Sequence, residues 1–191
     1  MTTNDIPHVT YISGKKTNLR PINPSDINHI FKYVNDREIM QFMGTRTPLS
    51  YQAEIDWIER VSKPNEHNIV FAVETKEKDF LGTMGLHNID LQNGLATTGA
   101  LFGNKELLGK GYGTDAKIVM LLWAFNQFPI RKISSSVYGP NKRSRRYLEK
   151  TGYKQEGRFR DHLFINGSYV DEYKMAVFRE DFLEEFGAYM K

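Results

Sequence analysis

The stretch "LFGNKELLGKGYGTDA", residues 101–116, decides how the rest of the sequence is interpreted. It holds Gly103, Gly109, Gly111 and Gly113 together with two lysines, and a long apolar segment follows it. Because glycine has no Cβ, successive backbone N–H groups in such a loop can approach a phosphate closely. A helix that begins there adds the partial positive charge of its N-terminus. The stretch therefore predicts a phosphate-binding loop at the start of a helix.

The spacing of the glycines excludes a Walker A loop, which requires G-x-x-x-x-G-K-[ST]. Five residues, not four, separate Gly103 from Gly109. Gly111 follows Lys110 at the position where Ser or Thr would bind magnesium. A magnesium-nucleotide loop of this kind is therefore not expected.

A Rossmann fingerprint matches the letters of the loop but not its surroundings. Residues 111–116 fit G-x-G-x-x-A, yet "NKELL" (104–108) separates them from the strand expected before them. The region near Ser134–Ser136, where the ribose-binding carboxylate of that motif would lie, contains none. A glycine-rich anion site that opens onto a helix N-terminus is the interpretation that remains.

Hydrophobic periodicity predicts a mixed α+β domain around this loop. Strands are expected at 9–19 (or a hairpin there), 68–75, 80–90, 95–103, 132–139, 153–157, 159–165 and 168–178, and helices from Ser25 or Asp26, at 39–43, 50–61, 113–128 and 141–152. Short turns make the strands between 68 and 103 an antiparallel meander, and Asn166-Gly167 signals a hairpin. The helix at 113–128 is apolar nearly all round, so we expect it to be buried on more than one side.

Composition limits the classes of function. The chain has 191 residues with 40% hydrophobic residues, which suits one folded domain over 1–191. A net charge of +3 is compatible with an anionic small ligand and is weak evidence for nucleic acid. With no cysteine and no H-x-x-x-H among five histidines, neither a disulfide nor a metal site is predicted.

The sequence gives no sign of membrane insertion. It has no apolar run long enough to span a bilayer, and residues 1–10 lack the charged start and apolar centre of a signal peptide. A cytoplasmic protein without membrane partners is therefore expected.

Three stretches resemble the GNAT superfamily of acetyl-CoA-dependent N-acetyltransferases. "GKGYGTDA" (109–116) is similar to the loop that binds the pyrophosphate of acetyl-CoA in that superfamily. Residues 18–44 and 141–178 resemble the opening and closing segments of the branch that contains the ribosomal-protein N-terminal (alanine/serine) acetyltransferases. The resemblance covers about residues 9–182 and implies a mixed, mostly antiparallel central sheet flanked by helices. Leu108 departs from the family pattern, which has Gln or Arg there, and this removes one side-chain contact.

The resemblance implies a reaction and a cofactor site. The acetyl group of acetyl-CoA would pass directly to a primary amine: a protein N-terminal amine, an amino sugar, a polyamine or another small amine. The cofactor-binding residues that it implies are Leu101, Phe102, Gly103, Leu108, Gly109, Lys110, Gly111, Tyr112, Gly113, Thr114, Asn141, Arg143 and Ser144. It also makes a homodimer plausible.

The general base is open at this stage. Relatives often carry Glu in the strand before the glycine loop, where this chain has Thr97. His87 is a candidate because its ordinary pKa lies near neutrality, and a surface role is the alternative. Glu74 is a weaker candidate, with a solvated carboxylate at a strand end as the alternative. A chain of waters without a dedicated base is a third possibility.

The group that meets the departing thiolate is also open. Ser144 is the candidate on the last predicted helix. Many superfamily members place a Tyr seven residues after the position of Asn141, where this chain has Leu148. Tyr147 is adjacent but about 100° round the helix, so we expect it to face elsewhere as a core or groove aromatic.

Two other functions compete with the enzyme. Leu108, Thr97 and Leu148 are compatible with a protein that binds acetyl-CoA without catalysis. The basic run "KRSRR" (142–146) is compatible with CoA phosphates, with a solvated helix face or, less well, with nucleic acid, which would require a broader basic patch.

Overall fold

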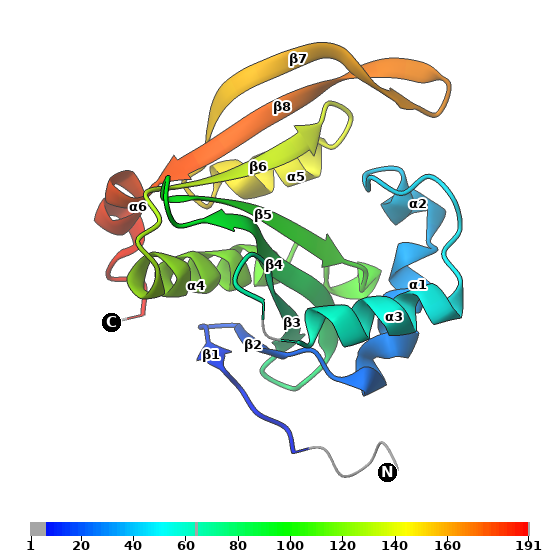
Figure 1. Ribbon diagram of the computed structural model, residues 1–191, viewed down its shortest axis with the longest axis horizontal. Helices are drawn as coiled ribbons and strands as arrows, with labels where there is room; N and C mark the ends of the chain where they lie inside the picture. The colour runs from blue at the N-terminus through cyan, green and yellow to red at the C-terminus, as the bar shows by residue number, and fades with distance from the viewer. Residues whose placement is uncertain (1–6, 64, 191) are drawn as a thin grey trace.

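The computed structural model describes residues 7–63 and 65–190. Its strands form one sheet in the order β1-β2-β3-β4-β5-β6-β8-β7 (Figure 1). They are β1 (Ile12–Ser13), β2 (Thr17–Pro21), β3 (Ile69–Thr75), β4 (Phe80–Asp90), β5 (Leu95–Phe102), β6 (Lys132–Tyr138), β7 (Lys154–Ile165) and β8 (Ser168–Phe178). Neighbouring strands are antiparallel apart from β5 and β6, which are parallel. The mixed, mostly antiparallel sheet confirms the predicted fold class.

Helices cover both faces of this sheet. They are α1 (Ile27–Val34), α2 (Arg37–Met40), α3 (Tyr51–Val61), α4 (Tyr112–Gln127), α5 (Lys142–Glu149) and α6 (Arg179–Phe186), with short 3₁₀ turns η1 (Pro24–Asp26) and η2 (Lys105–Leu107). Within the part of the chain that the structure describes, no helix is both long and apolar enough to cross a bilayer.

Successive side chains of β3 point to opposite faces of the sheet, and different helices cover the two faces. Phe71 and Val73 pack in the cluster that contains the buried face of α4. Ala72, between them, packs against Ile30 of α1 and Ile58 of α3. Because side chains alternate across a strand, one face of the sheet belongs to α4 and the other to α1 and α3.

Helix α4 lies at the centre of the molecule. Ala116 and Val119 contact the cluster under β2, β3 and β4, whereas Ile118, Leu121 and Phe125 contact the cluster under β5, β6 and β8. The helix is therefore buried on two sides, as its sequence predicts.

Two predicted boundaries are wrong. The segments expected as separate strands at 153–157 and 159–165 belong to one strand, β7, because bulges between Gln155 and Gly157 and between Phe159 and Leu163 keep it paired with β8. The short helix expected at 39–43 lies earlier, as α2 at Arg37–Met40. The first helix starts as expected, because Asp26 is the N-cap of α1, directly after the turn η1.

Strands β5 and β6 part from each other after a short pairing. They pair only from Leu95 to Thr97 and from Lys132 to Ser134. Beyond that point β5 stays bonded to β4 as far as Phe102, and β6 stays bonded to β8 as far as Tyr138. Because each strand is held by its outer neighbour, the two edges that face each other open into a cleft.

Candidate functional site

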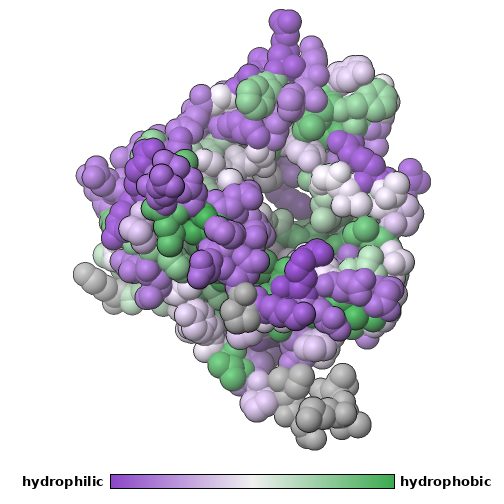
Figure 2. Space-filling view, viewed as in Figure 1, coloured by the Kyte–Doolittle hydropathy of each residue, from purple (hydrophilic) through white to green (hydrophobic). Residues whose placement is uncertain are grey.

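A cleft of about 740 Å³ begins at this opening, a volume in the range of small-molecule sites. Its walls come from β4, β5 and β6, from α1 and α3, and from the first turns of α4 and α5. The space-filling view is hollowed between the β7–β8 hairpin and the helices α1–α3 (Figure 2).

The glycine loop forms one end of the cleft. Gly109 (φ 79°) and Gly111 (φ 87°) adopt left-handed backbone conformations that favour glycine. The N–H of Asp115 donates to Gly111 O at 3.0 Å, which is the first backbone bond of α4. The N–H groups of Tyr112 and Gly113 therefore have no acceptor within the helix, and both residues line the cleft. This is the geometry of an anion site at a helix N-terminus.

Lys16, which the sequence analysis did not identify, places a cation beside this loop. Lys110 is exposed and does not line the cleft, whereas Lys16 Nζ donates to the carbonyl oxygen of Lys110 at 3.1 Å. Lys16 is held there by Asp115, whose carboxylate accepts backbone N–H groups from Lys15 (3.0 Å), Lys16 (2.9 Å) and Thr17 (2.8 Å). Burial opposes ionisation of Asp115, but hydrogen bonds from Thr17 and Lys16 outweigh it and lower its pKa.

Most of the predicted cofactor-binding residues line one cleft. These are Leu101, Phe102, Leu108, Gly109, Gly111, Tyr112, Gly113, Thr114, Asn141, Arg143 and Ser144. Gly103 does not line it. A Cβ at Gly103 would collide with the ring of Tyr33, and its N–H donates to Leu81 O at 3.2 Å. Close packing therefore accounts for Gly103 without a ligand.

The start of α5 brings polar groups to the opposite wall. Asn141 Oδ1 accepts the N–H of Ser144 at 3.0 Å, which makes Asn141 the N-cap of α5. Tyr147 is a groove aromatic, one of the two places expected for it. Leu148 is only 1% exposed in the main core, and Tyr147, one position earlier, turns toward α4, where a Cβ at Gly113 would lie 3.5 Å from its ring.

His87 lies on the other face of the sheet, beside α1 and α3. Its ring lies over Gly85 and Gly99, a cross-strand pair, and a Cβ at Gly99 would lie 3.4 Å from Nε2. Asn68 Oδ1 is 3.3 Å from Nδ1 and favours the tautomer with its proton there, so that Nε2 carries the lone pair. Burial, and then the charge of Lys117, lower the pKa of His87.

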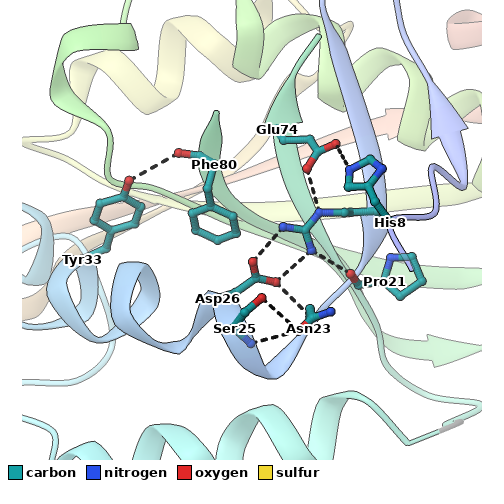
Figure 3. A network of polar contacts seen from close by, with 9 residues as sticks. His8, Pro21, Asn23, Ser25, Asp26, Tyr33, Glu74 and Phe80 are labelled. Carbon is teal, nitrogen blue, oxygen red and sulfur yellow. Dashed lines mark hydrogen bonds and ion pairs between the residues drawn. The ribbon is translucent and has the colours of Figure 1, made fainter. Parts of the chain in front are cut away.

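Glu74 lies outside the cleft. Its carboxylate is 1% exposed and is bound by Arg20 Nε at 2.7 Å and by His8 Nε2 at 2.7 Å. Arg20 also contacts Asp26 at 2.7 Å, so one ionic cluster joins β2, β3 and η1 (Figure 3). Glu74 is therefore a buried carboxylate of this ionic cluster, and neither a base in the cleft nor a solvated group at a strand end.

Two charged groups in the cleft were not identified from the sequence. Glu54 of α3 is 5% exposed, and burial raises its pKa. Lys117 of α4 is 1% exposed, and burial lowers its pKa to about 7. The available signal was a charged residue on an otherwise apolar helix face, since such residues are rarely buried without a role.

Comparison with known proteins finds similar sequences along most of the chain. A family model described as "Acetyltransferase (GNAT) domain" matches residues 16–154. An uncharacterized N-acetyltransferase from a Bacillus subtilis prophage, YokL, is 30% identical over 91% of this chain and 96% of its own length. A putative ribosomal N-acetyltransferase from the same organism, YdaF, is 33% identical over 47% of this chain and 49% of its own.

Solved structures agree on the fold. The crystal structure of spermidine N-acetyltransferase from Vibrio cholerae, in complex with CoA and spermine, superposes with a TM-score of 0.80 and 23% identity. The match covers 87% of this chain and 98% of the other.

Proposed function

Because the chain belongs to the GNAT family of acetyltransferases and is an acetyl-CoA-dependent N-acetyltransferase, we propose that its acceptor is a small cationic amine. The observation that carries this proposal is the buried side chain of Glu54 in the wall of the cleft. Phe42, Met43 and Trp57 line the same cleft and are apolar. A protonated amine that leaves water for such a site requires an anionic partner, and Glu54 supplies one.

His87 is the proposed base of the reaction. It lines the same cleft as Glu54, and its lowered pKa keeps the imidazole neutral near pH 7. Nε2 accepts the proton that the amine loses, directly or through one water. The family resemblance implies that the edge of β5 near Leu101–Gly103 supplies the N–H for the oxyanion; because the Gly103 N–H already bonds to Leu81 O, that donor belongs to the part of the edge at Leu101 and Phe102, which line the cleft.

The remaining residues hold the cosubstrate in line. Bound acetyl-CoA supplies an acetyl group already activated as a thioester. The N–H groups of the glycine loop receive its pyrophosphate, and Lys16 adds a positive charge beside them. Asn141 and Ser144 contact the pantetheine arm. Fixing both reactants in one cleft supplies much of the catalysis by reducing the entropy lost in the reaction.

The alternative of nucleic-acid binding receives no support from the basic run on α5. Arg145 pairs with Glu149 at 3.1 Å and stacks over the ring of Tyr173 at 4.7 Å. Arg143 and Arg146 line the cleft. The run is thus divided between intramolecular contacts and the cofactor site. The cytoplasmic location and the homodimer remain predictions from the sequence.

Turnover in the presence of several amines tests the proposed acceptor. Acetyl-CoA is first titrated into the protein by calorimetry, and thiol release is then measured with a polyamine, an amino sugar and a peptide with a free N-terminus. We expect release to be fastest with the polyamine. Release that is fastest with the peptide would overturn the small-amine proposal, and binding without release from any amine would favour the non-catalytic alternative.

Glu54→Gln tests how the amine is recognised. We expect the KM for the amine to rise about 10-fold or more, since a buried charge partner is lost, with little change in the KM for acetyl-CoA. Glu59→Gln is the matched control, because Glu59 is an exposed residue of the same helix that does not line the cleft. Equal amine KM values in the two variants would contradict the role of Glu54.

A further inference from the structure

Lys117 brings an amine into the interior of the cleft, where no carboxylate of residues 7–63 and 65–190 pairs with it. Its side chain lines the cleft, and Nζ lies 5.6 Å from the ring centroid of Tyr147 and 5.8 Å from that of Tyr153. Burial is the only influence found on its titration, with no hydrogen bond or carboxylate contributing from the residues described. A buried amine in this state is costly for a fold and is retained where it has a use.

Tyr147 adds a second unsatisfied group at the same place. Its hydroxyl is the one buried side-chain polar atom without a hydrogen-bond partner in residues 7–63 and 65–190. The neighbouring Tyr153 is different, because its buried hydroxyl forms a hydrogen bond with Thr98 Oγ1 at 2.9 Å, as buried hydroxyl groups ordinarily do. An unsatisfied hydroxyl beside an amine that contacts only aromatic rings, both on the cleft, indicates that a ligand atom binds between them.

The positions of Lys117 and His87 indicate that this ligand atom lies at the opening between β5 and β6. His87 shares its face of the sheet with Gly85 and Gly99, beside α1 and α3. Lys117 extends from α4, on the opposite face, where Leu86 and Ala96 pack. The two residues thus flank the opening between β5 and β6 from opposite sides. A thioester in this opening would present its carbonyl carbon to an amine on the His87 side and its sulfur to the Lys117 side.

We propose that Lys117 is a further catalytic residue, whose ammonium group contacts the sulfur of acetyl-CoA and protonates it as the acetyl group leaves, with Tyr147 Oη as a second donor. The inference rests on the proposed function. The ammonium group of the bound amine first loses one proton to solvent. The lone pair of the neutral nitrogen then forms a bond to the carbonyl carbon, and the C–S bond breaks with its electron pair remaining on sulfur. Lys117 gives a proton to that sulfur, and His87 takes one from the nitrogen. The proton on His87 then returns to Lys117 through water, so one turnover leaves both groups unchanged.

The acidity of Lys117 suits this step. Its pKa of about 7 lies below the ordinary thiol value of about 8.5, so transfer of a proton to the thiolate is downhill. An ordinary lysine, at about 10.4, would be too weak an acid. The titratable groups that face Lys117 are His87, Tyr147 and Tyr153, and burial holds both tyrosines neutral by raising their pKa values.

A binding cycle tests the contact with sulfur without relying on activity. CoA and desulfo-CoA, which lacks the sulfur, are titrated calorimetrically into the wild type and into Lys117→Met. We expect the wild type to bind CoA about 10-fold tighter than desulfo-CoA, and Lys117→Met to bind both within about 2-fold, because the charged hydrogen bond is lost. Lys32→Met, at an exposed lysine of α1 that does not line the cleft, retains the wild-type ratio.

The outcomes separate this inference from the function on which it rests. If the wild type binds neither compound, the acetyl-CoA site itself fails. If the wild type turns over and its affinity ratio is unchanged in Lys117→Met, the sulfur contact is overturned. Tyr147→Phe serves as a second variant if Lys117→Met does not fold, and we expect it to reduce the ratio by a smaller factor.

The rate of the chemical step provides the second readout. In Lys117→Met we expect kcat to fall about 100-fold, within the range of general acid catalysis, and the decline of wild-type kcat above pH 7 to disappear. A variant with unchanged kcat and an unchanged pH profile would contradict the role of Lys117 as an acid. Stable acetylation of Lys117 in the working enzyme would do so as well, because an amide nitrogen cannot donate this proton.

Discussion

The carboxylate of Asp115 accepts the backbone N–H of Lys16 at 2.9 Å, which joins the first turn of α4 to the turn between β1 and β2. Two further N–H groups and the hydroxyl groups of Thr17 and Tyr189 reach the same carboxylate. This contact fixes the helix start that carries the glycine loop, and it places the Lys16 amine beside that loop. The stability of the fold and the binding of the cofactor are thus coupled at one residue.

Asp115→Asn should therefore weaken both properties. An amide offers one acceptor where the carboxylate offers two, so buried N–H groups lose their partners and we expect roughly 2 kcal/mol less stability in urea unfolding. We also expect weaker acetyl-CoA binding in calorimetry. A variant with unchanged stability would show that these hydrogen bonds contribute nothing net.

Because the pKa of Asp115 is lowered, the stability of the wild type should depend on pH. A carboxyl group whose pKa is lower in the folded state stabilises the fold above its unfolded pKa of about 3.9. That contribution is lost as the pH falls through the folded value. Asp115→Asn should therefore differ most from the wild type at neutral pH and least in strong acid.

Gly111→Asp tests the anion site. The substitution places a carboxylate where the pyrophosphate is proposed to bind, so we expect acetyl-CoA affinity to fall at least about 100-fold. Gly167→Asp is the matched control, because Gly167 (φ 84°) has the same left-handed backbone in the β7–β8 turn, with nothing within 4 Å of a Cβ. The two variants should lose similar stability, and only Gly111→Asp should lose binding.

His87→Gln tests the proposed base. We expect kcat/KM to fall about 100-fold or more while calorimetric affinity for acetyl-CoA stays near that of the wild type. The wild-type rate should decline as the pH falls through the lowered pKa of His87, since the protonated imidazole cannot accept a proton. His162→Gln, at a half-exposed histidine of the β7–β8 hairpin, is the control. Equal rates in both variants would contradict the role of His87 and would indicate that water alone deprotonates the amine.

Much of the fold could be predicted because its signals are local. The alternating glycines around Lys110 and the Asn166-Gly167 turn each act through a few neighbouring backbone dihedrals. The short turns after Thr75 and Asp90 likewise specify the meander without reference to the rest of the chain.

The parts that failed depend on contacts between distant segments. Glu74 looks like a strand-end carboxylate until Arg20, 54 residues away, is seen to bind it. Lys16 reaches the glycine loop from 94 residues away, through its bond to Lys110 O. For Tyr147 the sequence left core and groove both open, because the choice depends on how α5 packs against α4, which helical periodicity alone does not specify.

Lys117→Met should raise the stability of the protein while it impairs catalysis. The folded pKa of Lys117, about 7, lies below the unfolded value of about 10.4, so the unfolded chain binds more protons between these limits. Wild-type stability therefore contains a penalty that is absent above pH 10.4, grows as the pH falls, and is complete below pH 7, where it is on the order of 4 kcal/mol.

Urea unfolding of the wild type and Lys117→Met at pH 7 and pH 10 measures that penalty. We expect the variant to exceed the wild type by several kcal/mol at pH 7 and by much less at pH 10. Lys32→Met should show no such dependence, because Lys32 is exposed. A wild type that is as stable as Lys117→Met at pH 7 would mean that the buried ammonium is already satisfied within the protein, and that it has no need of the sulfur of acetyl-CoA.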